Sequence, residues 1–87
     1  MNVEHCQTVI RTAHTAVDDA LNPLIDAEGG DPAAAFLVAG GAVKFLGSIL
    51  AFLESSGKDP AHYRKLIIDM MDETRAQIVD RMKATLQ

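Results

Sequence analysis

Residues 31–60 have the sequence DPAAAFLVAGGAVKFLGSILAFLESSGKDP, and this stretch decides the fold. It begins and ends with an Asp-Pro pair, in which the aspartate suits a helix N-cap and the proline suits the first helical position, whose N–H has no partner within the helix. Between Ala33 and Leu53 the only charged side chain is Lys44. The stretch therefore predicts one long apolar helix from about residue 32 to about residue 55, and the start of another helix at about residue 60.

Glycines mark where the preceding helices stop. Gly29 and Gly30 come before the first Asp-Pro pair and Gly57 comes before the second, and glycine suits the left-handed residue just past a helix end. The remaining helices are expected from about residue 3 to about residue 27 and from about residue 60 to about residue 85. Short connections favour antiparallel neighbours, so the predicted fold is all-α, a single domain with a three-helix antiparallel unit.

The first predicted helix carries an apolar stripe with alternating spacings of three and four residues, which places its members along one side. The stripe consists of Val3, Cys6, Ile10, Ala13, Val17, Ala20 and Leu24. Pro23 lies inside this helix, removes one backbone donor and disfavours helical geometry at Asn22. Either a kink or a break is expected near Leu21.

The middle helix has two unlike faces. Two helices of the same chain could bury one side, which carries large side chains. These are Val38, Phe45, Leu46, Ile49, Leu50, Phe52 and Leu53. The other side is small, with Gly40, Gly41, Gly47, Ser48 and Ala51 around Lys44. Glycine inside a helix costs about 1 kcal/mol relative to alanine, which suggests that another backbone comes close. We predict that Gly40, Lys44, Gly47 and Ala51 form an interface with a second copy, giving a homodimeric helical bundle.

The third predicted helix combines a narrow charged strip with a broad apolar surface. The strip contains Lys65, Asp69, Asp72, Glu73, Asp80 and Lys83, and its mixed signs are typical of a solvated face. One apolar stripe contains Tyr63, Leu66, Ile67, Met70, Thr74 and Ile78. A second stripe contains Ile68, Met71, Arg75, Val79 and Met82. We predict that it is an interface, because methionine and arginine are enriched at such surfaces.

Composition limits the classes of function. The chain has 87 residues, a size at which a monomer is marginally stable and association is a common remedy. Its net charge of −4 argues against a nucleic-acid partner. Cys6 is the only cysteine and is expected to be a small buried side chain, and residues 1–5 lack a basic region followed by an apolar run. We therefore expect a cytoplasmic protein.

Two groups of side chains suggest chemistry, and each has a simpler interpretation. His14 and Asp18 are four residues apart, a spacing at which the carboxylate can orient the imidazole; a lone histidine beside an apolar stripe is more often a core residue. Asp69, Asp72 and Glu73 share one side of a helix and could hold magnesium in a metal-dependent hydrolase, but a solvated charged strip is the preferred interpretation.

The segment from Ala33 to Leu53 is also long enough to span a bilayer, which gives a membrane-associated protein as another alternative. Lys44 at its centre counts against insertion, because a lysine there costs about 2.5 to 3.5 kcal/mol. The flanking residues Asp31 and Glu54 are acidic, and no Trp or Tyr marks either boundary. A helix buried in a soluble assembly is the preferred interpretation.

No catalytic or cofactor-binding residue is predicted. Surface suited to interfaces is abundant in the sequence, while convergent polar groups are few. The expected function is that of a non-catalytic, homo-oligomeric interaction module, such as an adaptor, regulatory or accessory protein. Its expected partners are a second copy of the chain and another protein.

Overall fold

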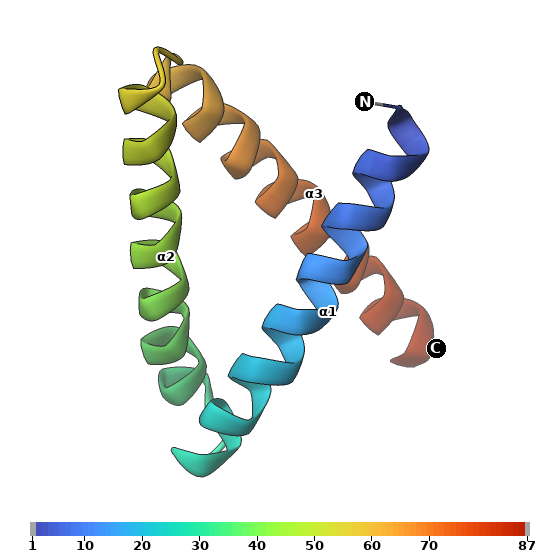
Figure 1. The fold of residues 1–87 in the computed structure, drawn as a ribbon. Helices are drawn as coiled ribbons and strands as arrows, with labels where there is room; N and C mark the ends of the chain where they lie inside the picture. Colours follow the sequence, from blue (N-terminus) through green and yellow to red (C-terminus); the bar gives the residue numbers. More distant parts are fainter. Residues whose placement is uncertain (1, 87) are drawn as a thin grey trace. The chain divides into compact units, whose positions relative to one another are not determined.

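The protein is all-helical, with three α-helices and no strand among residues 2–86, which are the residues that the computed structural model describes (Figure 1). Helix α1 spans Val3–Ala27, α2 spans Pro32–Ser55 and α3 spans Pro60–Leu86. The starts of all three helices and the ends of α1 and α2 agree with the predicted positions. Only the end of α3 differs, by one residue.

Each helix begins at a side chain that accepts a hydrogen bond from a backbone N–H of the first turn. The His5 N–H donates to Asn2 Oδ1 over 2.7 Å, the Ala34 N–H donates to Asp31 Oδ1 over 2.8 Å, and the Ala61 N–H donates to Asp59 Oδ1 over 3.1 Å. These bonds satisfy donors that have no partner within the helix. The start of each helix is therefore set by contacts within a few residues.

Glycines with positive φ end α1 and α2. Gly30 has a φ of 70° and its N–H donates to the Ile25 carbonyl over 2.9 Å. Gly57 has a φ of 85°, and the following N–H, that of Lys58, donates to the Leu53 carbonyl over 2.9 Å. A side chain at either glycine would strain this left-handed backbone, which is why glycine is the residue found there.

Pro23 lies inside α1 without ending it. The helix is continuous from Val3 to Ala27, so the break considered near Leu21 is wrong. A proline removes one backbone hydrogen bond but leaves the helical bonds on either side available. The N-cap of the helix is Asn2 and its C-cap is Glu28, so the helix ends at its caps and not at Pro23.

The chain consists of two compact units, with the boundary after Lys44. The first unit contains α1 and the beginning of α2. Ala34 is its best buried side chain, at 3% exposure, and Leu21, Ile25 and Val38 are half-buried.

The second unit contains the rest of α2 and all of α3. Its half-buried apolar positions on α2 are Leu46, Leu50 and Leu53, at helical spacings of four and three. On α3 the half-buried positions are Pro60, Tyr63, Ile67 and Val79. The first three of these lie in the two turns that follow the Gly57 connection, so the covered surface of α3 is concentrated near its beginning.

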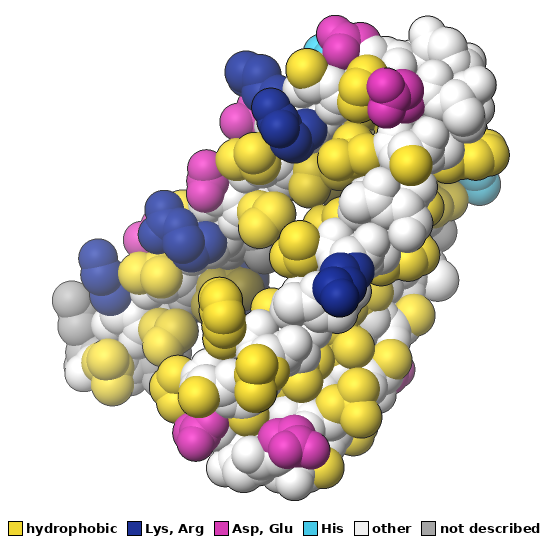
Figure 2. Space-filling view, turned by 90° about the vertical axis from the view of Figure 1, so that its left-hand side faces the viewer, with side chains coloured by type: hydrophobic (Ala, Val, Ile, Leu, Met, Phe, Trp, Pro, Cys, Tyr) yellow, Lys and Arg dark blue, Asp and Glu magenta, His cyan; other side chains and the backbone are white. Residues whose placement is uncertain are grey.

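Large apolar side chains remain exposed on all three helices, and Figure 2 shows hydrophobic side chains at the surface of the face it presents. They are Val3, Val9, Ile10, Val17, Leu24, Phe36, Leu37, Val43, Phe45, Ile49, Phe52, Leu66, Ile68, Met70, Met71, Ile78, Met82 and Leu86. Large exposed apolar areas on a protein commonly mark interaction sites.

The N-cap at Asp31 provides a direct test of the boundary between α1 and α2. Replacing it (Asp31→Ala) removes the acceptor for the Ala34 N–H, and the expected loss is about 1 kcal/mol in the free energy of unfolding. Asp31→Asn keeps an acceptor oxygen and should stay close to the wild type. Urea unfolding followed by circular dichroism, at one fixed protein concentration, measures both variants. Equal loss in the alanine and asparagine variants would contradict the capping role.

Candidate functional site

The small face of α2 is open in the structure. Gly40, Lys44, Gly47 and Ala51 are all exposed, and they follow one another at spacings of four, three and four residues. A Cβ atom added at Gly40 or Gly47 would meet no heavy atom within 4 Å, apart from the helix's own nearby backbone. Among residues 2–86, no neighbouring atom therefore requires glycine at these two positions, and the space in front of them is open.

Two large side chains at the start of α2 belong to the same region and were missed by the sequence analysis. Phe36 is 78% exposed and Leu37 is 72% exposed, one turn before Gly40. Their distance of four and three residues from Gly40 was the available signal, since this spacing puts them on or beside the small face. The small face is thus bordered by two apolar side chains toward the start of α2.

The face of α2 with large side chains is covered only in part. Val38, Leu46, Leu50 and Leu53 are half-buried, but Phe45 and Phe52 are 64% and 67% exposed. The expectation that two helices of one chain bury this whole face is therefore wrong for the two phenylalanines and for Ile49, which is 38% exposed. At about 100° per residue, the two phenylalanines point away from the half-buried leucines and toward the side of the helix that carries Gly41.

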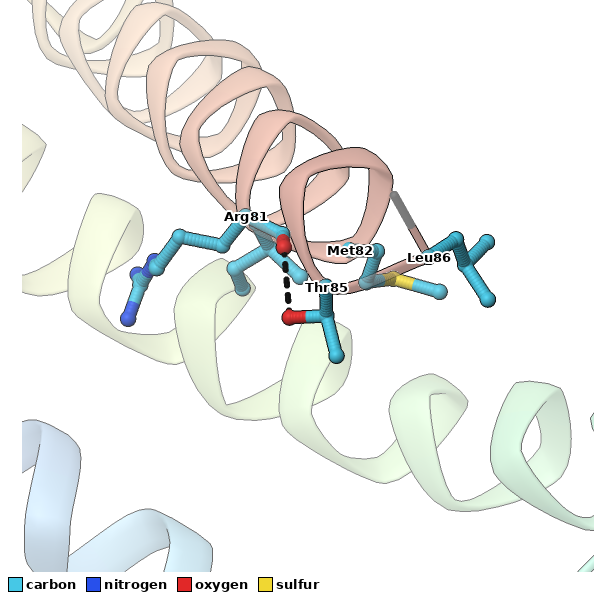
Figure 3. A pocket seen from close by; sticks show the side chains of 5 residues that line it. Arg81, Met82, Thr85 and Leu86 are labelled. Atoms are coloured by element: carbon cyan, nitrogen blue, oxygen red, sulfur yellow. Dashed lines mark hydrogen bonds between the residues drawn. The ribbon is translucent and has the colours of Figure 1, made fainter.

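The predicted interface stripe of α3 is also exposed over most of its length. Ile68 is 47%, Met71 is 55% and Met82 is 59% exposed; Arg75 is exposed, and Val79 is half-buried. Near the end of α3, Met82 also lines a shallow hollow together with Ile78, Arg81, Thr85 and Leu86, shown in Figure 3. There the Thr85 hydroxyl donates to the Arg81 carbonyl over 2.9 Å, which turns its methyl group outward.

The acidic residues of α3 make local contacts along its charged strip. Lys65 Nζ lies 2.9 Å from Asp69 Oδ2, and Gln77 Nε2 donates to Glu73 Oε1 over 3.5 Å. Within residues 2–86 no group of three or more His, Cys, Asp or Glu side chains is placed to hold a metal ion. Asp69, Asp72 and Glu73 share a helix side as predicted, and a metal site built with further ligands stays a hypothesis.

His14 and Asp18 form the predicted pair on α1, but at the surface. His14 Nε2 lies 3.4 Å from Asp18 Oδ2, and the two side chains are 61% and 54% exposed. The preferred interpretation of His14 as a core residue is therefore wrong in this structure. Cys6, expected to be buried, is half-buried. Periodicity placed both residues beside the apolar stripe of α1, but that stripe is itself largely exposed.

The chain matches no protein-family model, no curated protein sequence and no solved structure. The exposed surfaces of α2 and α3 are the candidate functional site, because they combine large apolar area with few polar groups.

Among the described residues, α2 is also the one helix that is long and apolar enough to cross a membrane. The most apolar 18-residue stretch of its 24 residues has a mean hydropathy of 2.0, and none of that stretch is buried. Length and composition alone do not separate a membrane span from a helix that a soluble assembly buries. Either a second protein chain or lipid could bury the exposed apolar surface of α2.

Proposed function

We propose that this chain is a non-catalytic interaction module that assembles with a copy of itself and presents its remaining apolar helical surface to another protein. The observation that supports the proposal is the exposure of large apolar side chains on all three helices. Exposed apolar surface that is grouped along helices is typical of interaction sites. The proposed location is the cytoplasm, in keeping with a single cysteine in the sequence.

Burial of the exposed side chains would provide a large driving force. Covering a leucine or phenylalanine side chain completely is worth about 1.5 to 3 kcal/mol, and Phe36, Leu37, Phe45 and Phe52 are each at least 64% exposed. A chain of 87 residues also buries a smaller fraction of its surface than a larger domain. Association therefore offers stability that the isolated chain lacks.

Sedimentation velocity in detergent-free buffer tests the proposal. The expected result is a species with a mass that is a multiple of 9.4 kDa, twice that mass if the assembly has the common twofold symmetry. Dilution should shift the distribution toward the single chain, because association follows mass action. If only the folded single chain is found at every concentration up to about 100 μM, self-association is contradicted.

The hydropathy of α2 favours a second candidate, a membrane-associated protein. In that case lipid rather than protein covers α2, and the chain should stay in solution only with detergent or with vesicles. Lys44 opposes this placement because a lysine at the centre of a membrane helix costs about 2.5 to 3.5 kcal/mol. The same sedimentation experiment, run with and without detergent, separates the two candidates.

A further inference from the structure

One stripe along α2 repeats at alternating spacings of three and four residues. It consists of Leu37, Gly40, Lys44, Gly47, Ala51 and Glu54, all of them exposed. This spacing is that of the two positions at which paired helices meet, so the six side chains share one seam of the helix. The seam includes one residue, Glu54, that the sequence analysis treated only as a flank.

In the second half of this seam, the order of side chains is complementary to the same order in an antiparallel copy. From Lys44 onward the seam has a cation, two small residues and an anion: Lys44, Gly47, Ala51, Glu54. When a second copy runs in the opposite direction, the anion faces the cation at each end and the small residues face each other in the middle. The two charges are ten residues apart, too far to pair within one helix, where ion pairs form at spacings of three or four.

We propose that α2 pairs with α2 of a second copy in antiparallel orientation, in the register centred on Ile49. Lys44 then lies opposite Glu54 of the partner subunit, and Gly47 lies opposite Ala51 of the partner subunit. The two layers of small residues allow the helix axes to approach at or below the usual distance of about 8 to 10 Å. This register rests on the proposed self-association and adds the geometry of the contact.

Charge separates this register from its neighbours. A parallel pair would place each Lys44 beside Lys44 of the partner subunit, and like charges in contact oppose association. An antiparallel pair shifted by one heptad would place Lys44 opposite Gly47 of the partner subunit and leave Glu54 opposite Leu37 of the partner subunit. Only the register centred on Ile49 matches both charges while keeping small residues opposed. The ion pairs lie at the edges of the contact, where they select the register more than they add affinity.

Charge reversal at the two positions tests the register. Lys44→Glu alone and Glu54→Lys alone each create two like-charge contacts across the twofold axis, and each should weaken self-association about 10-fold. The double variant, Lys44→Glu with Glu54→Lys, restores both pairs with reversed signs and should return to within about threefold of the wild type. Sedimentation equilibrium measures the dissociation constant, and circular dichroism checks that helix content is unchanged.

Recovery in the double variant cannot come from a contact within one helix, because of the ten-residue separation. A double variant no tighter than the weaker single variant would overturn the register, and so would single variants that associate like the wild type. If the wild-type chain itself does not associate, the proposed function fails instead, so the two failures are distinguishable.

A second measurement uses disulfide formation and does not depend on charge. In a Cys6→Ser background, a mixture of Gly47→Cys and Ala51→Cys chains should form the mixed disulfide dimer in a glutathione redox buffer. A mixture of Gly40→Cys and Ala51→Cys chains is the matched control, because these positions face each other only after a shift of one heptad. Preferential cross-linking of the control mixture would overturn the register.

Discussion

Gly47→Leu is expected to dissociate the assembly while leaving the helices intact. In the single chain a Cβ at this position meets no neighbour within 4 Å, and leucine is the better helix former, so the isolated chain should accept the change. In the assembly the leucine enters a layer of small residues on the partner subunit. Overpacking of this kind costs about 1 to 3 kcal/mol, which is a loss of affinity of about 5- to 150-fold.

Two variants control for effects on the helix itself. Gly47→Ala adds only a methyl group and should keep the assembly while raising helix stability by up to about 1 kcal/mol. Gly41→Leu makes the same exchange at a glycine that also has open space in front of it but does not belong to the seam. Sedimentation velocity should show a smaller species for Gly47→Leu alone. A normal assembly with a higher melting temperature for Gly47→Leu would mean that the small face is solvent-exposed in the working protein.

The second large effect is expected on α3. Both methionines of the interface stripe are replaced in the variant Met71→Glu with Met82→Glu. We expect it to bind its partner, or to assemble, with an affinity at least about 100-fold lower than the wild type. The reason is that an uncompensated charge in a buried contact costs about 3 to 5 kcal/mol. Both side chains are more than half exposed in the single chain, at 55% and 59%, so the isolated helix should tolerate the change.

A charge added elsewhere on α3 provides the comparison. Ala76→Glu places one new carboxylate within the charged strip of α3, at an exposed position away from the stripe, and should leave assembly and partner binding unchanged. Helix content by circular dichroism and size by sedimentation should be measured for the Met71→Glu single variant, the double variant and this control. If the double variant behaves like the control, the stripe with Ile68 and Val79 is exposed surface without a partner.

The helix boundaries were determined by the sequence alone. Asp31, Asp59 and the glycines at 30 and 57 act through hydrogen bonds and backbone angles within five residues of themselves. Such local interactions depend little on the rest of the molecule, which is why the Asp-Pro pairs placed α2 and α3 correctly. The seam of α2 is equally local, because the spacing of its residues and the helical period decide which side chains share one side.

Only the tertiary structure decided which apolar side chains are covered. The helical period predicted a buried face for Phe45 and Phe52 and a core position for His14, yet all three side chains are exposed. Periodicity shows that side chains share a face but not what lies opposite, because burial depends on contacts between elements distant in sequence. Pro23 is a similar case. The sequence shows that this proline removes one backbone hydrogen bond, but only the structure shows that the helix continues past it to Ala27.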